Sequence, residues 1–278
     1  MTSINTLFES LFSSIDSSIY DLLDDIIFIN TGIFDNSFIE KLLGPNASTN
    51  LLIIANSLLI GFFVYYCFRL LFSNLYTIQV EPPYQFIFKV LVFSICINFS
   101  FFICEKLVYI NSLISSSIRA VGENLLHKNI CFSQLIDELN SLIITEESTF
   151  DFFSFDGIIK SFTSINLLTL SFSFALRYIM VKVFILITPF AILTLLNNST
   201  SWFFKSWFRS FFSLLIIQSF ISLILLIIFT LDFTSDTLSK ILFVGALFAL
   251  TKVNMYVRDL IGGISTDIQA NFSNFTKK

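Results

Sequence analysis

The sequence predicts an all-α integral membrane protein with about five transmembrane helices and further amphipathic helices on the extracytoplasmic side. Hydrophobic residues make up 55% of the 278-residue chain and charged residues only 13%, about half the charged share of a soluble domain. The mean hydropathy is +0.83. The apolar residues lie in continuous runs, without the alternation that is typical of membrane β-strands. A soluble fold could not bury this much apolar surface, so we expect lipid to solvate it.

Five segments are apolar over about the 20 residues that a helix needs to cross a bilayer. The predicted spans are 51–72, 86–107, a stretch within 166–196, 211–231 and 241–257. The first span has no charge before Arg69, and the fourth has none at all. Lys252 and Asn254 interrupt the fifth span, which makes it the weakest of the five.

The segments outside these spans divide the chain into further regions. Residues 1–50 are expected to be an extracytoplasmic amphipathic region, because apolar residues within 1–30 repeat at helical spacing and the acidic residues mostly avoid that stripe. Residues 51–107 would hold the first two spans, and 166–257 the last three. Residues 108–165 are expected to be an extracytoplasmic loop with amphipathic helices, and 258–278 a cytoplasmic tail.

The distribution of Lys and Arg predicts the orientation, because cytoplasmic flanks of spans are enriched in both. The first 50 residues contain Lys41 as their only base. The connection between the third and fourth spans contains Lys205 and Arg209 and no acid, and the C-terminal end is basic. We therefore expect a multi-pass membrane protein with its N-terminus outside and its C-terminus in the cytoplasm.

Signals of enzymatic chemistry are nearly absent. His127 is the single histidine, so one chain cannot form a histidine-based metal cluster. No phosphate-binding loop, nucleophile elbow or zinc-protease helix occurs in the sequence. We expect no catalytic residue, no metal and no cofactor. No Asp or Glu lies inside a predicted span core, and five spans do not divide into two equal repeats, which weighs against an ion-coupled transporter.

The third span contains the charged groups nearest to a bilayer centre, Arg177 and Lys182. An unpaired Arg there costs at least about 2.5–3.5 kcal/mol on insertion scales. The two side chains could face a translocation path or pair with a neighbouring helix; alternatively, the long helix shifts so that both reach the interface. Pro189 could kink this helix inside the span or end it at the cytoplasmic side.

Three further groups of residues predict contacts instead of chemistry. Interface anchors are expected in the connection between the third and fourth spans, where Trp and basic residues alternate: Trp202, Lys205, Trp207 and Arg209. Gly245 and Ala249 form a small-x-x-x-small pair that would allow close helix packing. Cys104 and Cys131 both fall on the predicted outer side, where a disulfide could form, although we expect none.

The third and fourth spans resemble a known family. Arg177-Tyr178, then Thr188-Pro189-Phe190-Ala191, then Trp202 and Trp207 before an apolar span, and finally Gly262-Gly263 are similar to TrbL-type inner-membrane subunits of bacterial type IV secretion and conjugation systems. The motifs cover roughly residues 165–265, and the first 160 residues match in layout only.

The resemblance implies a non-enzymatic channel or scaffold subunit of a type IV secretion or conjugative DNA-transfer machine. Such a subunit would assemble in several copies in the lipid bilayer with other machine components, including a cytoplasmic ATPase, and would contact translocated DNA or protein transiently. The alternative is a small-molecule permease or the membrane subunit of a transporter. A membrane assembly or immunity factor without a transport role is a third interpretation.

Overall fold

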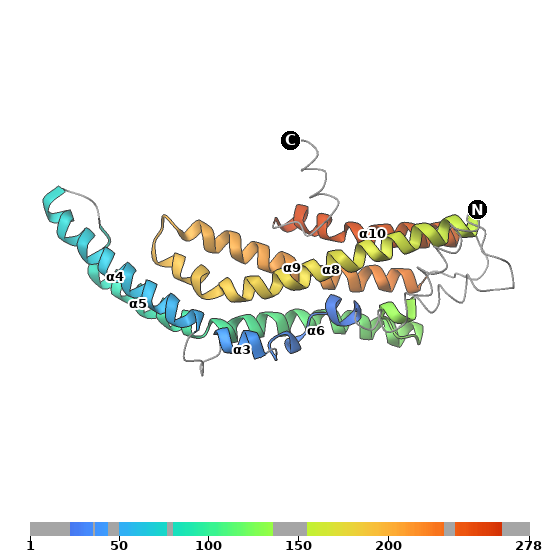
Figure 1. Cartoon of the computed structure of the whole chain (residues 1–278), viewed down its shortest axis with the longest axis horizontal. Coiled ribbons are helices and arrows are strands. Elements are labelled where there is room, and N and C mark those ends of the chain that lie inside the picture. The colour runs from blue at the N-terminus through green and yellow to red at the C-terminus, as the bar shows by residue number, and fades with distance from the viewer. Residues whose placement is uncertain are drawn as a thin grey trace. The chain divides into compact units, whose positions relative to one another are not determined.

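The computed structural model describes residues 23–35, 37–43, 50–76, 80–135, 155–230 and 237–262, and these residues contain helices and no strand. Two short elements come first, the 3₁₀ helix η1 (Thr31–Ile33) and α3 (Ser37–Leu43). The long helices are labelled in Figure 1: α4 (Leu51–Tyr76), α5 (Pro83–Asn98), α6 (Ser100–Leu126), α8 (Phe155–Leu193), α9 (Ser201–Phe229) and α10 (Thr237–Ile261). The 3₁₀ helix η2 (Thr194–Leu196) extends α8 by one turn.

Five of these helices are long and apolar enough to cross a membrane. The candidate spans are Leu51–Ser73 in α4, Ser100–Leu126, Ile165–Leu196, Ser201–Phe229 and Ile241–Ile261. Large apolar side chains project from them without protein cover; Ile60 and Phe68 on α4 are 62% and 57% exposed. Water would solvate such surfaces poorly, so they require lipid. The chain is therefore an all-α, multi-pass integral membrane protein in contact with the bilayer, as the sequence predicts.

The helices form two compact units. Unit 1 consists of residues 1–29, 111–179 and 213–278, and unit 2 consists of residues 30–110 and 180–212. Helices α6, α8 and α9 each contribute residues to both units. Each unit is described below by itself.

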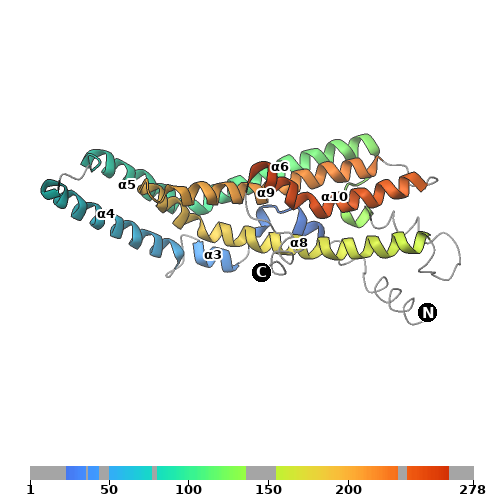
Figure 2. The same ribbon diagram turned by 90° about the horizontal axis from the view of Figure 1, so that it is seen from above.

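In unit 2, α4 and α5 form an antiparallel hairpin (Figure 2). Small and aliphatic residues of α4 and α5 pack against the end of α8 and η2 in an apolar core: Leu52, Ala55, Ile97, Ile192, Leu193 and Leu196. Asn56 and Asn98 join the two hairpin helices, with the Asn56 Nδ2 to Asn98 Oδ1 distance at 3.2 Å. Tyr66 and Phe86 stack at the other end, with ring centroids 3.7 Å apart.

The predicted second span, residues 86–107, is not one helix, and this prediction was wrong in its bounds. The helix is interrupted at Phe99: α5 ends at Asn98 and α6 begins at Ser100. The Asn98 side chain donates to the Ser94 carbonyl at 2.8 Å, and such bonds compete with the helical ladder. At 16 residues, α5 is only about 24 Å long and too short to cross the bilayer alone.

The interruption at Phe99 does not reverse the chain. The Phe99 N–H donates to the Ile95 carbonyl at 3.0 Å, and the Ile103 N–H donates to the Phe99 carbonyl at 2.9 Å. Backbone bonds therefore continue across the break. The candidate span is Ser100–Leu126, and α5 is a shorter apolar helix before it. The described residues therefore still contain five candidate spans, and the second extends well beyond residue 107.

The predicted extracytoplasmic region 108–165 consequently contains parts of two long helices. Helix α6 continues to Leu126, and α8 already begins at Phe155. The sequence predicts Glu105 near the end of the second span and no acid inside a span core, whereas the candidate span Ser100–Leu126 contains both Glu105 and Glu123. The amphipathic pattern in residues 1–22, the loop residues 136–154 and the tail residues 263–278, including Gly263, lie outside the described residues.

Candidate functional site

The guanidinium of Arg177 is the centre of the candidate site in unit 1. Arg177 lies on α8, within the candidate span Ile165–Leu196, and its side chain is completely buried. It is the bulkiest of the fully buried side chains among the described residues. Burial of a cation is strongly unfavourable unless acceptors replace its water, so the identity of the acceptors decides what this residue can do.

The acceptors of Arg177 are almost all main-chain carbonyls. Its Nε donates to the Leu214 carbonyl at 2.7 Å, and its Nη1 donates to the Ile27 carbonyl at 2.9 Å. Its Nη2 makes longer contacts with the Leu215 carbonyl at 3.5 Å and with Gln218 Oε1 at 3.4 Å. Arg177 thus joins α8 to α9 and to the segment before η1, and each of these acceptors is neutral.

The Ile27 carbonyl is a favourable acceptor for physical reasons. Residues 23–27 are helical and the helix ends at Ile27. The last carbonyls of a helix lack intrahelical donors and carry the negative end of the helix dipole. A buried cation at this position satisfies the unpaired carbonyl and balances the negative end of the dipole. Arg177 therefore caps the C-terminal end of a helix that is 150 residues distant in sequence.

Two other contacts hold the same segment in unit 1. The Asp24 carboxylate accepts hydrogen bonds from the Phe132 N–H at 3.0 Å and from the Ser133 N–H at 3.4 Å. The guanidinium of Arg119 on α6 lies over the Phe28 ring, 4.0 Å from its centroid, in a cation–π contact. The segment 24–28 is therefore held in unit 1 by three of its own groups: the Asp24 carboxylate, the Ile27 carbonyl and the Phe28 ring.

Helices α6 and α9 complete the polar interior of unit 1. The Asn111 side chain donates to the Leu215 carbonyl at 2.9 Å, next to the Arg177 contacts. Farther along, the hydroxyls of Ser115 and Ser222 lie 2.8 Å apart. These buried bonds replace water inside an otherwise apolar bundle. The arrangement suits the holding of helices together, and it fits the helix-pairing alternative for Arg177 better than a translocation path.

The other two candidates on α8 differ from Arg177. Lys182 is half-buried, and it does not belong to the Arg177 contacts. Pro189 is buried inside α8, and the helix continues past it to Leu193. Pro189 cannot donate a backbone hydrogen bond to the preceding turn, but it does not end the helix.

The expected interface anchors fall into two groups. Trp202, Lys205 and Arg209 are exposed on α9. Trp207, in contrast, is only 5% exposed, and its Nε1 donates to the Phe184 carbonyl on α8 at 3.0 Å. An indole that is buried between helices cannot contact lipid headgroups, so Trp207 packs the interior of unit 2.

The close helix contact that we expected at Gly245 and Ala249 is found at another glycine. Gly245 is exposed, and a Cβ added there would meet no atom within 4 Å, while Ala249 is half-buried. The close approach occurs instead at Gly122 on α6, where a Cβ would collide with Ile130 and Leu226. Gly122 therefore allows close packing that the Gly245–Ala249 pair does not provide among the described residues.

All four cysteines are free, so Cys104 and Cys131 form no disulfide. Cys104 is buried in unit 2, where its Sγ lies 3.0 Å from Thr188 Oγ1. Cys131 Sγ lies 3.1 Å from Ser133 Oγ. The described residues also contain no group of three His, Cys, Asp or Glu side chains that could hold a metal ion.

Two features were not predicted from the sequence: the partners of Arg177, and a polar cluster around Glu81 with Lys89 and Asn198. Main-chain carbonyls leave no trace in a sequence, so Ile27 and Leu214 could not be found. Glu81 could have been noticed, because an acid that directly precedes Pro82 and Pro83 at a predicted helix start is a common position for helix stabilisation.

Comparison with known proteins assigns the chain to no family. No family model matches the sequence, no curated protein matches it, and no solved structure matches its fold. The function proposed below therefore depends on the chain's own residues and contacts.

Proposed function

We propose that the chain is a non-enzymatic channel or scaffold subunit of a bacterial type IV secretion or conjugative DNA-transfer machine. It would lie in the cytoplasmic membrane with its N-terminus outside and its C-terminus in the cytoplasm. The observation that supports this proposal most is the use of Arg177, the charged residue at the centre of the family resemblance, as a buried connection between helices.

The contacts of Arg177 favour a structural role over transport. A residue that binds a passing solute must be reachable from water and must exchange partners. Arg177 is fully buried, and its guanidinium donates hydrogen bonds to the carbonyls of Leu214 and Ile27. An assembly subunit, in contrast, needs a rigid bundle that presents its outer faces to neighbours, and exposed apolar helices such as α4 offer such faces.

The partners follow from the same proposal. Several copies of the chain would assemble with other membrane subunits and with an ATPase at the cytoplasmic face. The exposed basic side chains of Lys205 and Arg209 lie in the first part of α9, which follows the connection that we assign to the cytoplasm. Translocated DNA or protein would contact the assembly only transiently.

Co-purification from the native host tests the proposal. The tagged full-length chain should bring down other secretion components, including the ATPase, after mild detergent extraction. Deletion of its gene should abolish transfer, and the intact gene should restore it. If the tagged chain associates with none of these components and the deletion leaves transfer unchanged, the proposal fails.

A small-molecule permease remains the alternative, and reconstitution separates the two. A permease in sealed vesicles would carry a solute, and Arg177→Ala should abolish this flux. The loss counts as evidence for a permease only if the variant retains the helical content of the wild type. The secretion subunit should carry no small solute alone. Solute flux by the wild-type chain would therefore contradict the secretion proposal.

A further inference from the structure

Unit 2 contains a cavity of about 250 Å³ that the proposed function does not use. It lies among the second half of α4, the start of α5 and the residues that follow η2. One wall is aromatic and includes the stacked rings of Tyr66 and Phe86. Another part of the lining is polar and includes the consecutive residues Asn197, Asn198 and Ser199.

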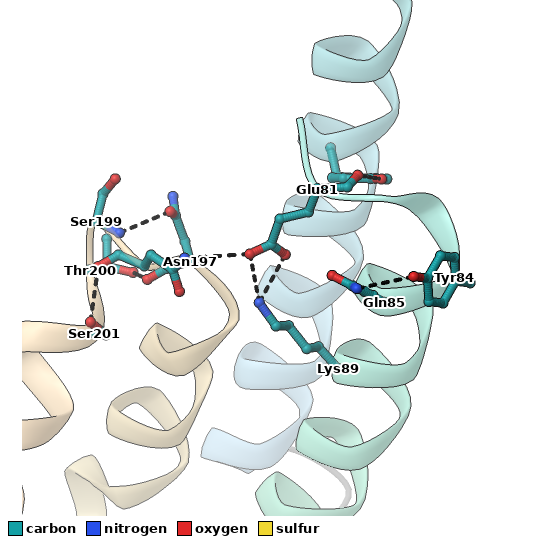
Figure 3. A network of polar contacts seen from close by, with 10 residues as sticks. Glu81, Tyr84, Gln85, Lys89, Asn197, Ser199, Thr200 and Ser201 are labelled. Carbon is teal, nitrogen blue, oxygen red and sulfur yellow. Dashed lines mark hydrogen bonds and ion pairs between the residues drawn. The ribbon is translucent and has the colours of Figure 1, made fainter. Parts of the chain in front are cut away.

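A network around Glu81 fixes the polar side of the cavity (Figure 3). Lys89 Nζ lies 2.7 Å from Glu81 Oε1 and 2.8 Å from Oε2, so this lysine neutralises the carboxylate. Asn198 Nδ2 donates to Glu81 Oε1 at 3.4 Å, and the Tyr66 hydroxyl donates to the Glu81 carbonyl at 2.7 Å. Glu81 thus joins α4, α5 and the connection before α9 without leaving a net negative charge.

Arg69 is the remaining charge of the cavity. It is exposed on α4, and no hydrogen bond or ion pair joins it to another described residue. Nearby, Asn197 uses its Oδ1 to accept from the Ser199 N–H at 3.1 Å, which leaves its amide N–H groups as donors. Among the described residues, the cavity lining therefore offers one cation without an ion pair and several neutral donors, a combination that suits an anion.

The cavity lies where spans end. Arg69 lies four residues before the end of the span Leu51–Ser73, and Asn197 directly follows the span Ile165–Leu196. Ser201 begins the next span. Asn197–Ser199 are therefore at a membrane–water boundary, with apolar helix on one side and water on the other. Phosphate groups of lipids are the anions that occupy this depth of a bilayer.

We propose that this cavity binds the phosphate group of an anionic phospholipid. Arg69 contacts the phosphate oxygens, and the amide of Asn197 and the hydroxyl of Ser199 donate hydrogen bonds to the headgroup. The rings of Tyr66 and Phe86 pack against the glycerol and the first acyl carbons. This inference is independent of the proposed secretion role, because a permease or an assembly factor could hold the same lipid.

Native mass spectrometry of the full-length chain in detergent tests the site. The chain is titrated with phosphatidylglycerol, with diacylglycerol that has the same tails but no phosphate, and with soluble glycerol 1-phosphate. We expect tight binding of phosphatidylglycerol only. Arg69→Gln should weaken that binding by at least about tenfold, because charge-assisted hydrogen bonds to the phosphate are lost.

Arg209→Gln is the matched control, because Arg209 is also an exposed arginine within a candidate span but does not line the cavity. It should leave the affinity for phosphatidylglycerol within about twofold of the wild-type value. Equal losses in both variants would show non-specific attraction and overturn the proposal. Equal binding of diacylglycerol would overturn the phosphate contact, and equal binding of glycerol 1-phosphate would overturn the assignment to a lipid.

Discussion

At the scale of single residues, Arg177 shows how a charge can be retained inside a membrane bundle. Its insertion would cost at least about 2.5–3.5 kcal/mol if it were unpaired. The carbonyls of Leu214 and Ile27 replace its water at 2.7 and 2.9 Å. Removal of the guanidinium would leave the Ile27 carbonyl, which has no helical donor, buried without a partner.

Arg177→Gln should therefore destabilise the protein. The shorter side chain cannot reach both carbonyls, and each buried acceptor that is left unsatisfied costs about 1–3 kcal/mol. We expect a lower free energy of unfolding in detergent micelles, measured by denaturant titration with circular dichroism. The exposed control Arg209→Gln should stay within about 0.5 kcal/mol of the wild type. Equal stability of the two variants would show that the Arg177 contacts are not structural.

At the scale of elements, α6 packs closely at Gly122. A side chain at Gly122 would meet the terminal methyl groups of Ile130 and Leu226, which would have to move, whereas one at Gly245 on α10 would extend into open space. Over-packing of a filled interior costs about 1–3 kcal/mol. Close packing between membrane helices commonly uses small residues in this way.

Gly122→Leu and Gly245→Leu make a matched pair for this contact. Both substitutions replace glycine by a better helix former, so their difference reports the packing. We expect Gly122→Leu to lower the thermal unfolding midpoint in detergent clearly below that of Gly245→Leu. Similar midpoints for the two variants would refute close packing at Gly122.

The all-α fold class and most span positions could be predicted from the sequence, because apolar runs long enough to span a bilayer are easily recognised. The second span could not, since the apolar run continues across Phe99 and gives no sign of the bond from Asn98 to the Ser94 carbonyl. The polar residues of α6 suggested a surface helix. Their buried partners, such as Leu215 for Asn111, lie about a hundred residues away along the chain. Arg177 was visible as a charge in an apolar run, but its acceptors were not.

At the scale of the whole molecule, the five candidate spans determine which groups would share a side of the membrane. The spans lie in α4, α6, α8, α9 and α10, and α5 is a shorter apolar helix between the first two. An odd number of passes places the two ends of the chain on opposite sides. The cavity beside Asn197 and the C-terminal end after α10 would then face the same side, which we assign to the cytoplasm.

The most direct test of this five-pass account is the location of both chain ends in intact cells. Epitope tags before Met1 and after Lys278 are probed with a membrane-impermeant protease on spheroplasts, with lysed cells as the control. The account predicts that the N-terminal tag is cleaved in intact spheroplasts and that the C-terminal tag is protected until lysis. Cleavage or protection of both tags together would contradict five passes, and the reverse pattern would contradict the orientation.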